Sequence, residues 1–308
     1  MRRLVWIGVM LSACGWLACS SNLRDSSFSS GSSDSGTGGL FGGSDAGGFG
    51  SSSGGGGAGC SEAAKLVYVV SDGAELYSFE PASLKFTLKG TLKCPGIATP
   101  NSMAIDRSGT AWVNYSDGSL FKVSTKDASC SATPFAPGQS GFKRVGMAFA
   151  SDTAGSQSET LYVVGIDDLA GRGRGLAKID LTTFKLTTIG DFSGSLRGLG
   201  AELTGTGDAK LYGFFTTSPS ATLAQIDKSG AQTSGDKSLT GVNTGLAWAF
   251  SFWGGDFWFY TSDGLTPSKV SRLKTSSDGS ISTAVANVGG FRIVGAGVST
   301  CAPLTPPK

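Results

Sequence analysis

The chain has 308 residues, 48 of them glycine, and a formal net charge of +2. Without Arg2 and Arg3 the basic and acidic residues balance (25 − 2 = 23 against 23), and so the rest of the chain has no electrostatic footprint for nucleic acid. Histidine is absent, which excludes a Ser-His-Asp triad, histidine-based acid–base catalysis and the commonest metal ligand.

Residues 1–19 have the pattern of a lipoprotein signal. A basic start precedes an apolar segment of about ten residues, shorter than the roughly 20 that span a membrane. Leu11-Ser12-Ala13-Cys14 resembles the lipobox of bacterial lipoproteins, and Trp16-Leu17-Ala18-Cys19 is a poorer second candidate. The resemblance implies cleavage before Cys14 or Cys19, and acylation of that cysteine with palmitate and similar chains. An ordinary signal peptide that contains cysteine is the alternative.

Residues 20–59 are dominated by Ser and Gly and show no apolar periodicity. Such a segment cannot bury enough surface to offset its ordering entropy, and we expect a disordered tether with a reach of about 35 Å. It would hold the folded part clear of the membrane. Neither Gly15 nor Ser20 is the aspartate that retains lipoproteins at the inner membrane, so the outer membrane or the cell surface is the favoured location.

Residues 60–308 contain a five-fold repeat of short strand-like segments. An aliphatic or small residue followed by Tyr or Trp recurs at Val67-Tyr68, Ala111-Trp112, Leu161-Tyr162, Leu211-Tyr212 and Phe257-Trp258. A second segment follows each copy, beginning at Leu76, Leu120, Leu176, Leu223 and Val270. The spacing of roughly 44 to 56 residues is the length of a four-stranded propeller blade. The pattern predicts an all-β fold, a five-bladed β-propeller of antiparallel blades.

A third repeat of small residues lies upstream of four of the aromatic copies. It reads Ser102-Met103-Ala104, Gly146-Met147-Ala148, Gly198-Leu199-Gly200 and Gly245-Leu246-Ala247, and its fifth copy, Gly295-Ala296-Gly297, follows the last aromatic strand. The displaced copy predicts that the C-terminal strand closes the ring as the innermost strand of the first blade. Small residues suit the innermost strands because the five innermost strands, one from each blade, converge on a narrow axis.

Four cysteines remain outside the signal, and an even number in an exported protein indicates disulfides. Cys60 precedes the first blade and Cys301 ends its proposed innermost strand, and so antiparallel pairing of these strands brings the two together. Cys94 and Cys130 then pair by elimination. The cysteine spacing and the lack of histidine predict no metal site, and no cofactor is expected.

The segment Ala104-Ile105-Asp106-Arg107-Ser108-Gly109-Thr110-Ala111-Trp112-Val113 resembles the blade motif of NHL and virginiamycin B lyase-like propellers. The resemblance implies the propeller fold. The lyases of that group depend on a histidine that this chain lacks, and so lyase activity does not follow from it.

The loops that enter the innermost strands supply the candidate ligand-binding residues. They carry Asn101, Arg144, Arg197, Asn243 and Arg292, and three arginines around one axis suit a carboxylate, sulfate or phosphate. The alternative is that these arginines pair with Asp72, Asp117, Asp167 or Asp168 on the same face. The aromatic run 250–260 is expected to pack between blades rather than to form a glycan-stacking platform.

No catalytic signature is present, and we favour a membrane-anchored, monomeric binding or scaffolding module for a glycan, a peptide or an envelope protein. A histidine-independent lyase or hydrolase is the second hypothesis, which a buried carboxylate with a raised pKa beside the channel would favour. The third is a subunit of an envelope assembly, which an exposed apolar patch on one face would favour.

Overall fold

The computed structural model describes residues 60–167 and 172–307. The signal, the lipidation candidates Cys14 and Cys19, and the tether lie outside these residues. The described part contains three short 3-10 helices, η1 (Ala63–Lys65), η2 (Gln139–Gly141) and η3 (Gly194–Leu196). In that part of the chain no helix has the length and apolar character that crossing a membrane requires.

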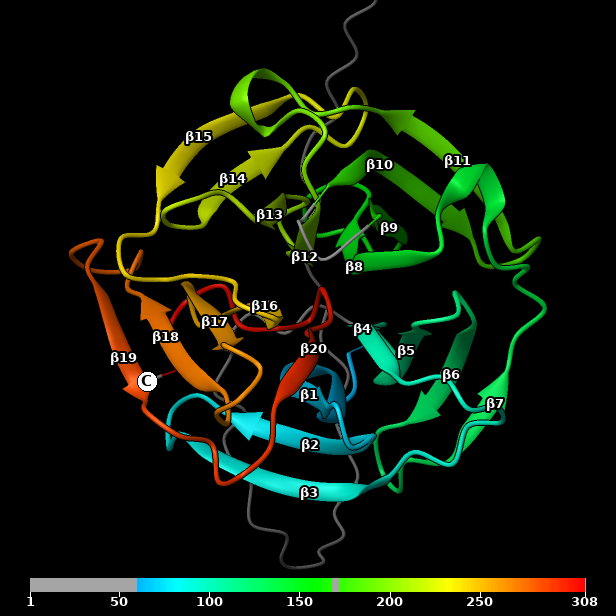
Figure 1. Cartoon of the computed structure of the whole chain (residues 1–308), viewed down its shortest axis with the longest axis horizontal. Coiled ribbons are helices and arrows are strands. Elements are labelled where there is room, and N and C mark those ends of the chain that lie inside the picture. Colours follow the sequence, from blue (N-terminus) through cyan, green and yellow to red (C-terminus); the bar gives the residue numbers. More distant parts are fainter. Residues whose placement is uncertain (1–59, 168–171, 308) are drawn as a thin grey trace, which may run out of the picture. The chain divides into compact units, whose positions relative to one another are not determined.

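The described residues form a five-bladed β-propeller of four-stranded antiparallel blades, as the repeats predict (Figure 1). Blade 1 consists of β20 (Ile293–Gly297), β1 (Val67–Ser71), β2 (Glu75–Glu80) and β3 (Lys85–Thr91), from the axis outward. Blade 2 consists of β4 (Pro100–Ile105), β5 (Thr110–Tyr115), β6 (Leu120–Ser124) and β7 (Cys130–Ala132). Blade 3 consists of β8 (Arg144–Ser151), β9 (Glu159–Ile166), β10 (Gly173–Asp180) and β11 (Lys185–Gly190). Blade 4 consists of β12 (Ala201–Gly205), β13 (Leu211–Phe215), β14 (Thr222–Ile226) and β15 (Thr233–Ser238). Blade 5 consists of β16 (Ala247–Trp253), β17 (Asp256–Ser262), β18 (Lys269–Leu273) and β19 (Ile281–Val285).

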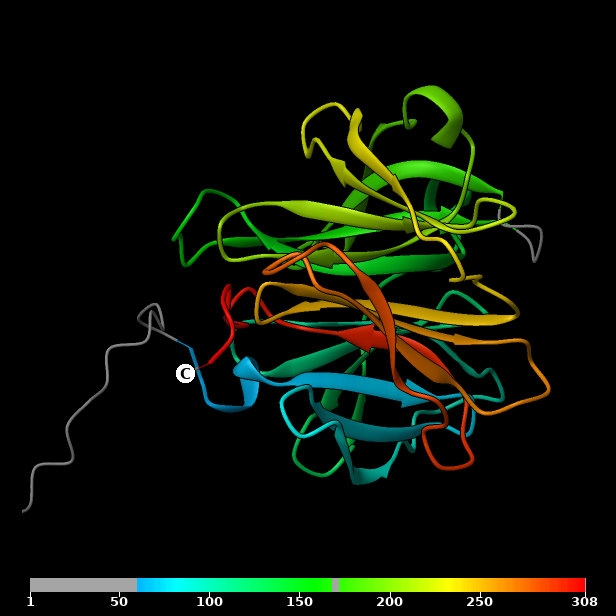
Figure 2. The ribbon, with the colours of Figure 1, turned by 90° about the vertical axis from the view of Figure 1, so that its left-hand side faces the viewer.

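The C-terminal strand β20 closes the ring, as predicted. It pairs antiparallel with β1, and Tyr68 lies opposite Gly297. Figure 2 shows the blue start and the red end of the propeller at the same end of the blades. Cys60 and Cys301 form a disulfide there, with their Cα atoms 5.8 Å apart. The covalent bond therefore joins the two ends of the ring.

The second disulfide joins the outer parts of neighbouring blades. Cys94 follows β3 of blade 1, Cys130 begins β7 of blade 2, and their Cα atoms are 5.1 Å apart. The pairing expected by elimination is confirmed.

Each hydrophobic core lies between two adjacent blades, because every sheet has two faces and both are covered. Five clusters of buried side chains fill the five interfaces. The aromatic run 250–260 belongs to them: Phe214 of blade 4 contacts Phe250 and Phe259 of blade 5 with ring centroids 5.7 Å and 4.9 Å apart. The prediction that this run packs between blades is confirmed.

Glycine lets the innermost strands approach one another closely. A Cβ atom at Gly146 of β8 would lie 2.0 Å from the carbonyl oxygen of Ala201 on β12. One at Gly205 would lie 2.1 Å from the carbonyl oxygen of Phe149. The small residues predicted for the innermost strands are therefore required where β8 meets β12.

The predicted innermost segments of blades 4 and 5 are wrong by four residues. In blades 1 to 3 the aromatic residue of the second strand lies opposite the last residue of the small-residue repeat, as Trp112 lies opposite Ala104. In blade 4 Tyr212 lies opposite Thr204, and in blade 5 Trp258 lies opposite Ser251. The innermost copies are therefore 202–204 and 249–251. The glycine-rich segments 198–200 and 245–247 instead lead into these strands.

Candidate functional site

The innermost strands all begin on one face of the propeller, the upper face, and end on the other, the lower face. All five predicted ligand-binding residues lie on the upper face, in or just before the strands β4, β8, β12, β16 and β20. The structure places them in different surroundings, and only some of them have free side chains.

Arg292 and Asn101 are engaged in structural contacts. The Nε atom of Arg292 donates to Asp72 Oδ2 at 2.7 Å, and Nη1 donates to the carbonyl oxygen of Gly264. These bonds tie the β1–β2 hairpin of blade 1 to the β17–β18 loop of blade 5. Asn101 Nδ2 donates to Asn114 Oδ1 at 3.2 Å and to the carbonyl oxygen of Val145 at 3.0 Å.

Arg197 and Asn243 lie at the periphery of the upper face. The Arg197 side chain is 76% exposed and its Nε atom lies 3.3 Å from Asp191 Oδ2. At that exposure the ion pair contributes little to stability. Asn243 is exposed, and its side chain has no hydrogen-bond partner among the described residues. Neither residue lines either of the two upper-face hollows described below.

Arg144 lies between two hollows of the upper face. Its guanidinium group has no hydrogen bond or ion pair with any described residue, although the residue is partly buried. The first hollow, which we call the basic recess, has a volume of about 520 Å³. It is lined by Gly141, Lys143, Arg144, Ile166, Asp167, Arg172, Gly173, Arg174 and Gly198.

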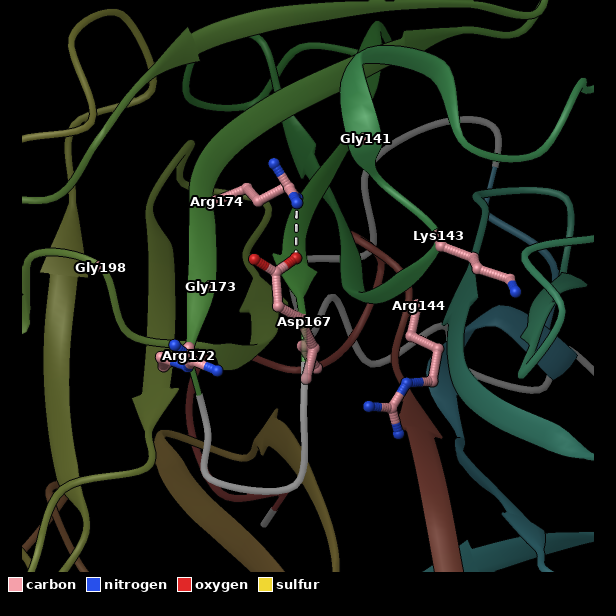
Figure 3. A pocket seen from close by; sticks show the side chains of 9 residues that line it. Gly141, Lys143, Arg144, Asp167, Arg172, Gly173, Arg174 and Gly198 are labelled. Atoms are coloured by element: carbon pink, nitrogen blue, oxygen red, sulfur yellow. Dashed lines mark hydrogen bonds and ion pairs between the residues drawn. The ribbon is translucent and has the colours of Figure 1, made fainter.

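The basic recess carries four basic side chains and one carboxylate. Arg174 Nε lies 2.7 Å from Asp167 Oδ1, which neutralises one of the four. Figure 3 shows Lys143 and Arg144 on the opposite side of the hollow from Arg174 and Arg172. Lys143 and Arg144 form no ion pair with a described residue, so their side of the recess is positively charged in a chain that is otherwise close to neutral.

The second hollow is the upper mouth of the central channel, with a volume of about 160 Å³. It is lined by Thr99, Pro100, Asn101, Ser116, Arg144, Ile166, Glu202, Leu246, Ala247, Trp248 and Val294, which come from all five blades. Arg144 and Ile166 line both hollows, and so the basic recess and the channel mouth are adjacent.

Glu202 is a functional candidate that the sequence did not identify. It lies on the innermost strand β12, is only 2% exposed, and its Oε2 accepts a hydrogen bond of 2.7 Å from Ser102 Oγ on β4. Blades 4 and 2 are not adjacent, so this bond crosses the axis of the propeller. Burial raises the pKa of Glu202 well above its usual value, while Ser102 and the backbone amide of Met147 act in the opposite direction. Burial therefore favours the neutral form of this carboxyl group.

The sequence missed Glu202 because the small-residue repeat placed blade 4 four residues too early. With Gly198-Leu199-Gly200 assigned to the axis, Glu202 was expected beyond it. The signal that would have found it is the spacing in blade 2, where Trp112 follows its partner Ala104 by eight residues (112 − 104 = 8); the same spacing before Tyr212 points to Thr204.

A second partly buried carboxyl group lies on the lower face. Glu159 Oε1 accepts from the backbone amide of Arg107 at 2.8 Å, and Oε2 accepts from Thr300 Oγ1 at 2.7 Å. Burial raises the pKa of Glu159 to about 7, partly opposed by these two bonds. The Arg107 guanidinium also contacts Thr300 and Cys60, at 3.0 Å and 3.3 Å. This network links blades 1, 2 and 3 beneath the channel.

A third hollow of about 360 Å³ lies beside the ring-closing disulfide on the lower face, lined by Cys60, Arg107, Gly155, Ser156, Gly207, Asp208, Thr300, Cys301, Ala302 and Leu304. Neither channel end holds a metal-binding set: in residues 60–167 and 172–307 no three Cys, Asp or Glu side chains come together as ligands.

Comparison with known proteins gives no family. No family model and no curated protein matches the chain. Solved propeller structures do match it. The chain is 14% identical to YjhT, with 65% of this chain and 69% of that chain covered and a TM-score of 0.46. It is 13% identical to the Dos1 propeller (70% and 54% covered, TM-score 0.41) and 12% identical to TolB from Acinetobacter baumannii (71% and 52%, 0.39).

The chain spans about half the length of the Dos1 and TolB chains that it matches. At these identities and scores the similarity carries no argument about function, and the propeller fold follows from the topology of the blades themselves.

Proposed function

We propose that this protein is a lipid-anchored, extracytoplasmic binding propeller that takes an anionic ligand on its upper face. The observation that carries the proposal is the basic recess, where Arg144 presents a guanidinium group without a counter-ion among the described residues. A planar guanidinium forms two parallel hydrogen bonds to a carboxylate, a sulfate or a phosphate. Lys143 adds a second positive charge on the same side of the recess (Figure 3).

The proposed site is smaller than the ring of residues that the sequence suggested. Of the three arginines around the axis, Arg292 is held by Asp72 and Arg197 lies at the periphery beside Asp191. Arg144 is the one whose charge is available, and it stands where the recess meets the channel mouth. The proposed ligand contacts therefore gather on blade 3 rather than forming a ring.

The sequence and the disulfides support the proposed location. The signal-like residues 1–19 with Cys14 or Cys19 suit acylation, and two disulfides suit an oxidising compartment outside the cytoplasm. The absence of aspartate after either cysteine favours the outer membrane or cell surface. The motif at 104–113 supports a place among the NHL and virginiamycin B lyase-like propellers. Labelling with a palmitate analogue, with Cys14 and Cys19 replaced in turn, identifies the acylated residue.

The binding proposal is tested by titrating the purified full-length chain with a panel of anionic glycans, acidic peptides and small anions. Arg144→Gln is expected to weaken binding of the ligands found by about tenfold or more, because a charge-assisted hydrogen bond is lost. Arg197→Gln is the matched control, an upper-face arginine outside the recess, and should bind like the parent chain. A panel without ligands, or ligands that Arg144→Gln binds equally well, would contradict the proposal.

Glu202 favours a second candidate, a histidine-independent lyase or hydrolase, because it is a buried carboxyl with a raised pKa beside the channel. Glycoside hydrolysis commonly needs two carboxyl groups about 5 to 10 Å apart. The described residues that line the channel mouth include one carboxyl group. Binding is therefore the better supported function. Enzymatic conversion of a panel ligand by the parent chain, with no conversion by Glu202→Gln, would instead favour the lyase or hydrolase.

The third candidate, a subunit of an envelope assembly, is favoured by exposed apolar side chains on the upper face. Ile97, Leu246 and Leu265 are 104%, 59% and 91% exposed. Leu246 also lines the channel mouth. A partner that covers this face would shield these side chains, and would show as a stable complex after cross-linking in the native membrane.

A further inference from the structure

The channel mouth has the features of a subsite for one particular chemical group. It is a hollow of about 160 Å³ with a buried carboxyl group, a free guanidinium and the polar side chains of Thr99 and Ser116 in its lining. A water molecule occupies about 30 Å³ in the liquid, so the hollow has the volume of about five water molecules. That space suits one small ring rather than a chain of rings. The wider basic recess adjoins it through Arg144.

In the neutral form that burial favours, the Glu202 carboxyl group and the Ser102 hydroxyl together hold two hydrogens. The bond of 2.7 Å that joins them uses one, and the other is left for a ligand. The other group near the carboxyl, the amide of Met147, is also a donor. The pair therefore has a spare donor and suits a ligand that accepts a hydrogen bond.

The same lining disfavours a cationic group at this position. Arg144 brings a positive charge to the hollow, and burial favours the neutral form of the Glu202 carboxyl group. A ligand hydroxyl both donates and accepts, which matches a neutral carboxyl together with the hydroxyls of Thr99 and Ser116. Trp248 adds an aromatic side chain to the wall, of a kind that commonly packs on apolar faces of ligands.

We propose that the channel mouth binds the sugar ring of a hexuronic acid or of a similar sugar acid, with Glu202 hydrogen-bonded to a ring hydroxyl and Arg144 bound to the carboxylate. This inference rests on the proposed function, since it uses the same Arg144, and names the class of ligand. The ring would be the end unit of a glycan, and the units after it would pass over the basic recess.

The test titrates the full-length chain with glucuronate and galacturonate, with the matching neutral hexoses, and with acetate. The parent chain should bind one uronate at least about tenfold more tightly than its neutral hexose and than acetate. Arg144→Gln should abolish the preference for the uronate over the neutral hexose. Glu202→Leu should lose about tenfold or more in uronate affinity, whereas Glu202→Gln, whose amide also donates and accepts, should stay within a few-fold of the parent.

Deoxy derivatives of the bound uronate test the contact without any substitution in the protein. Loss of one particular hydroxyl should weaken binding by about tenfold or more, and that effect should vanish in Glu202→Leu if this variant folds. Equal affinity for every deoxy derivative, or parent-like binding by Glu202→Leu, would overturn the inference. If other anions bind through Arg144 but no uronate binds, this inference is overturned and the proposed function stands. If the parent chain binds no anion of the panel, both this inference and the proposed function are overturned.

Discussion

At the residue scale, the buried carboxyl group of Glu202 and the partly buried one of Glu159 lie toward opposite faces of the propeller and differ in their partners. Glu202 lies near the upper mouth with Ser102 and Met147, and has no charged neighbour that shifts its pKa. Glu159 lies near the lower end, where burial is the first cause of its raised pKa, the bonds from Arg107 and Thr300 oppose it, and Asp106 adds to it. The upper carboxyl group borders a ligand-sized hollow, whereas the lower one joins three blades.

Glu159 should make the stability of the propeller depend on pH. Its folded-state pKa of about 7 lies above the unfolded value of 4.5, so the folded protein binds more protons between these values. The favourable contribution is complete below pH 4.5 and is lost as the pH rises through 7. From pH 5 to pH 8 the free energy of unfolding should fall by about 2 to 3 kcal/mol on account of this residue.

Denaturant unfolding of the parent chain and of Glu159→Gln at pH 5 and pH 8 checks this contribution. The variant carries no charge at either pH and resembles the protonated carboxyl group that predominates at pH 5, and so it should show a flatter pH dependence than the parent. Parallel pH profiles for the two proteins would mean that Glu159 has an ordinary pKa.

At the element scale, the innermost strands determine how closely neighbouring blades pack and which side chains lie at the axis. Gly146 on β8 lies against the backbone of Ala201 on β12, and the residue after Ala201 is Glu202. The close approach of these two strands therefore positions the carboxyl group that lines the channel mouth.

Gly146→Ala should destabilise the propeller by about 3 kcal/mol. The added Cβ would lie 2.0 Å from the carbonyl oxygen of Ala201, and backbone on both sides must move to accommodate it. Gly73→Ala in the β1–β2 hairpin is the control, since its Cβ would meet its nearest neighbour, Ser71 Oγ, at 3.6 Å. Its expected change is within about 0.5 kcal/mol. Similar unfolding midpoints for the two variants would refute the packing argument.

The sequence predicted the blade count and the order of strands because aromatic residues recur at blade spacing. It predicted both disulfides because ring closure brings Cys60 and Cys301 together and leaves Cys94 and Cys130. It failed where small residues occur twice. The small-residue segment 198–200 precedes β12, and segment 245–247 ends on the first residue of β16. Both resemble innermost strands in composition, and composition does not reveal which of two small segments pairs with the aromatic strand. Because of the same ambiguity, the sequence did not place Glu202 at the axis. The partners of Arg292 and Arg144 depend on side-chain positions that no repeat encodes.

At the scale of the whole molecule, the two disulfides should differ in their effect on stability. Cys60–Cys301 closes a loop with a sequence separation of 241, and Cys94–Cys130 one of 36. In the loop-entropy model the longer loop stabilises by about 5 kcal/mol and the shorter by about 4 kcal/mol. The ring-closing bond also holds β20 in blade 1.

Replacing each cysteine pair with serine and measuring the free energy of unfolding compares the two bonds. The Cys60→Ser, Cys301→Ser protein should be the less stable by about 1 to 2 kcal/mol. It should also show faster hydrogen exchange in β20 and β1, the pair at which the ring opens. If replacing Cys94 and Cys130 lowers the free energy of unfolding more than replacing Cys60 and Cys301, then ring closure depends on strand pairing and packing rather than on the covalent bond.

The binding of an anionic ligand at the upper face is tested most directly by a crystal structure of the full-length chain with a ligand found in the panel. The account predicts electron density for the ligand where the basic recess meets the channel mouth, with its anionic group within hydrogen-bond distance of the Arg144 guanidinium. Density on the lower face beside Arg107 and the Cys60–Cys301 disulfide, with the upper hollows unchanged, would contradict it.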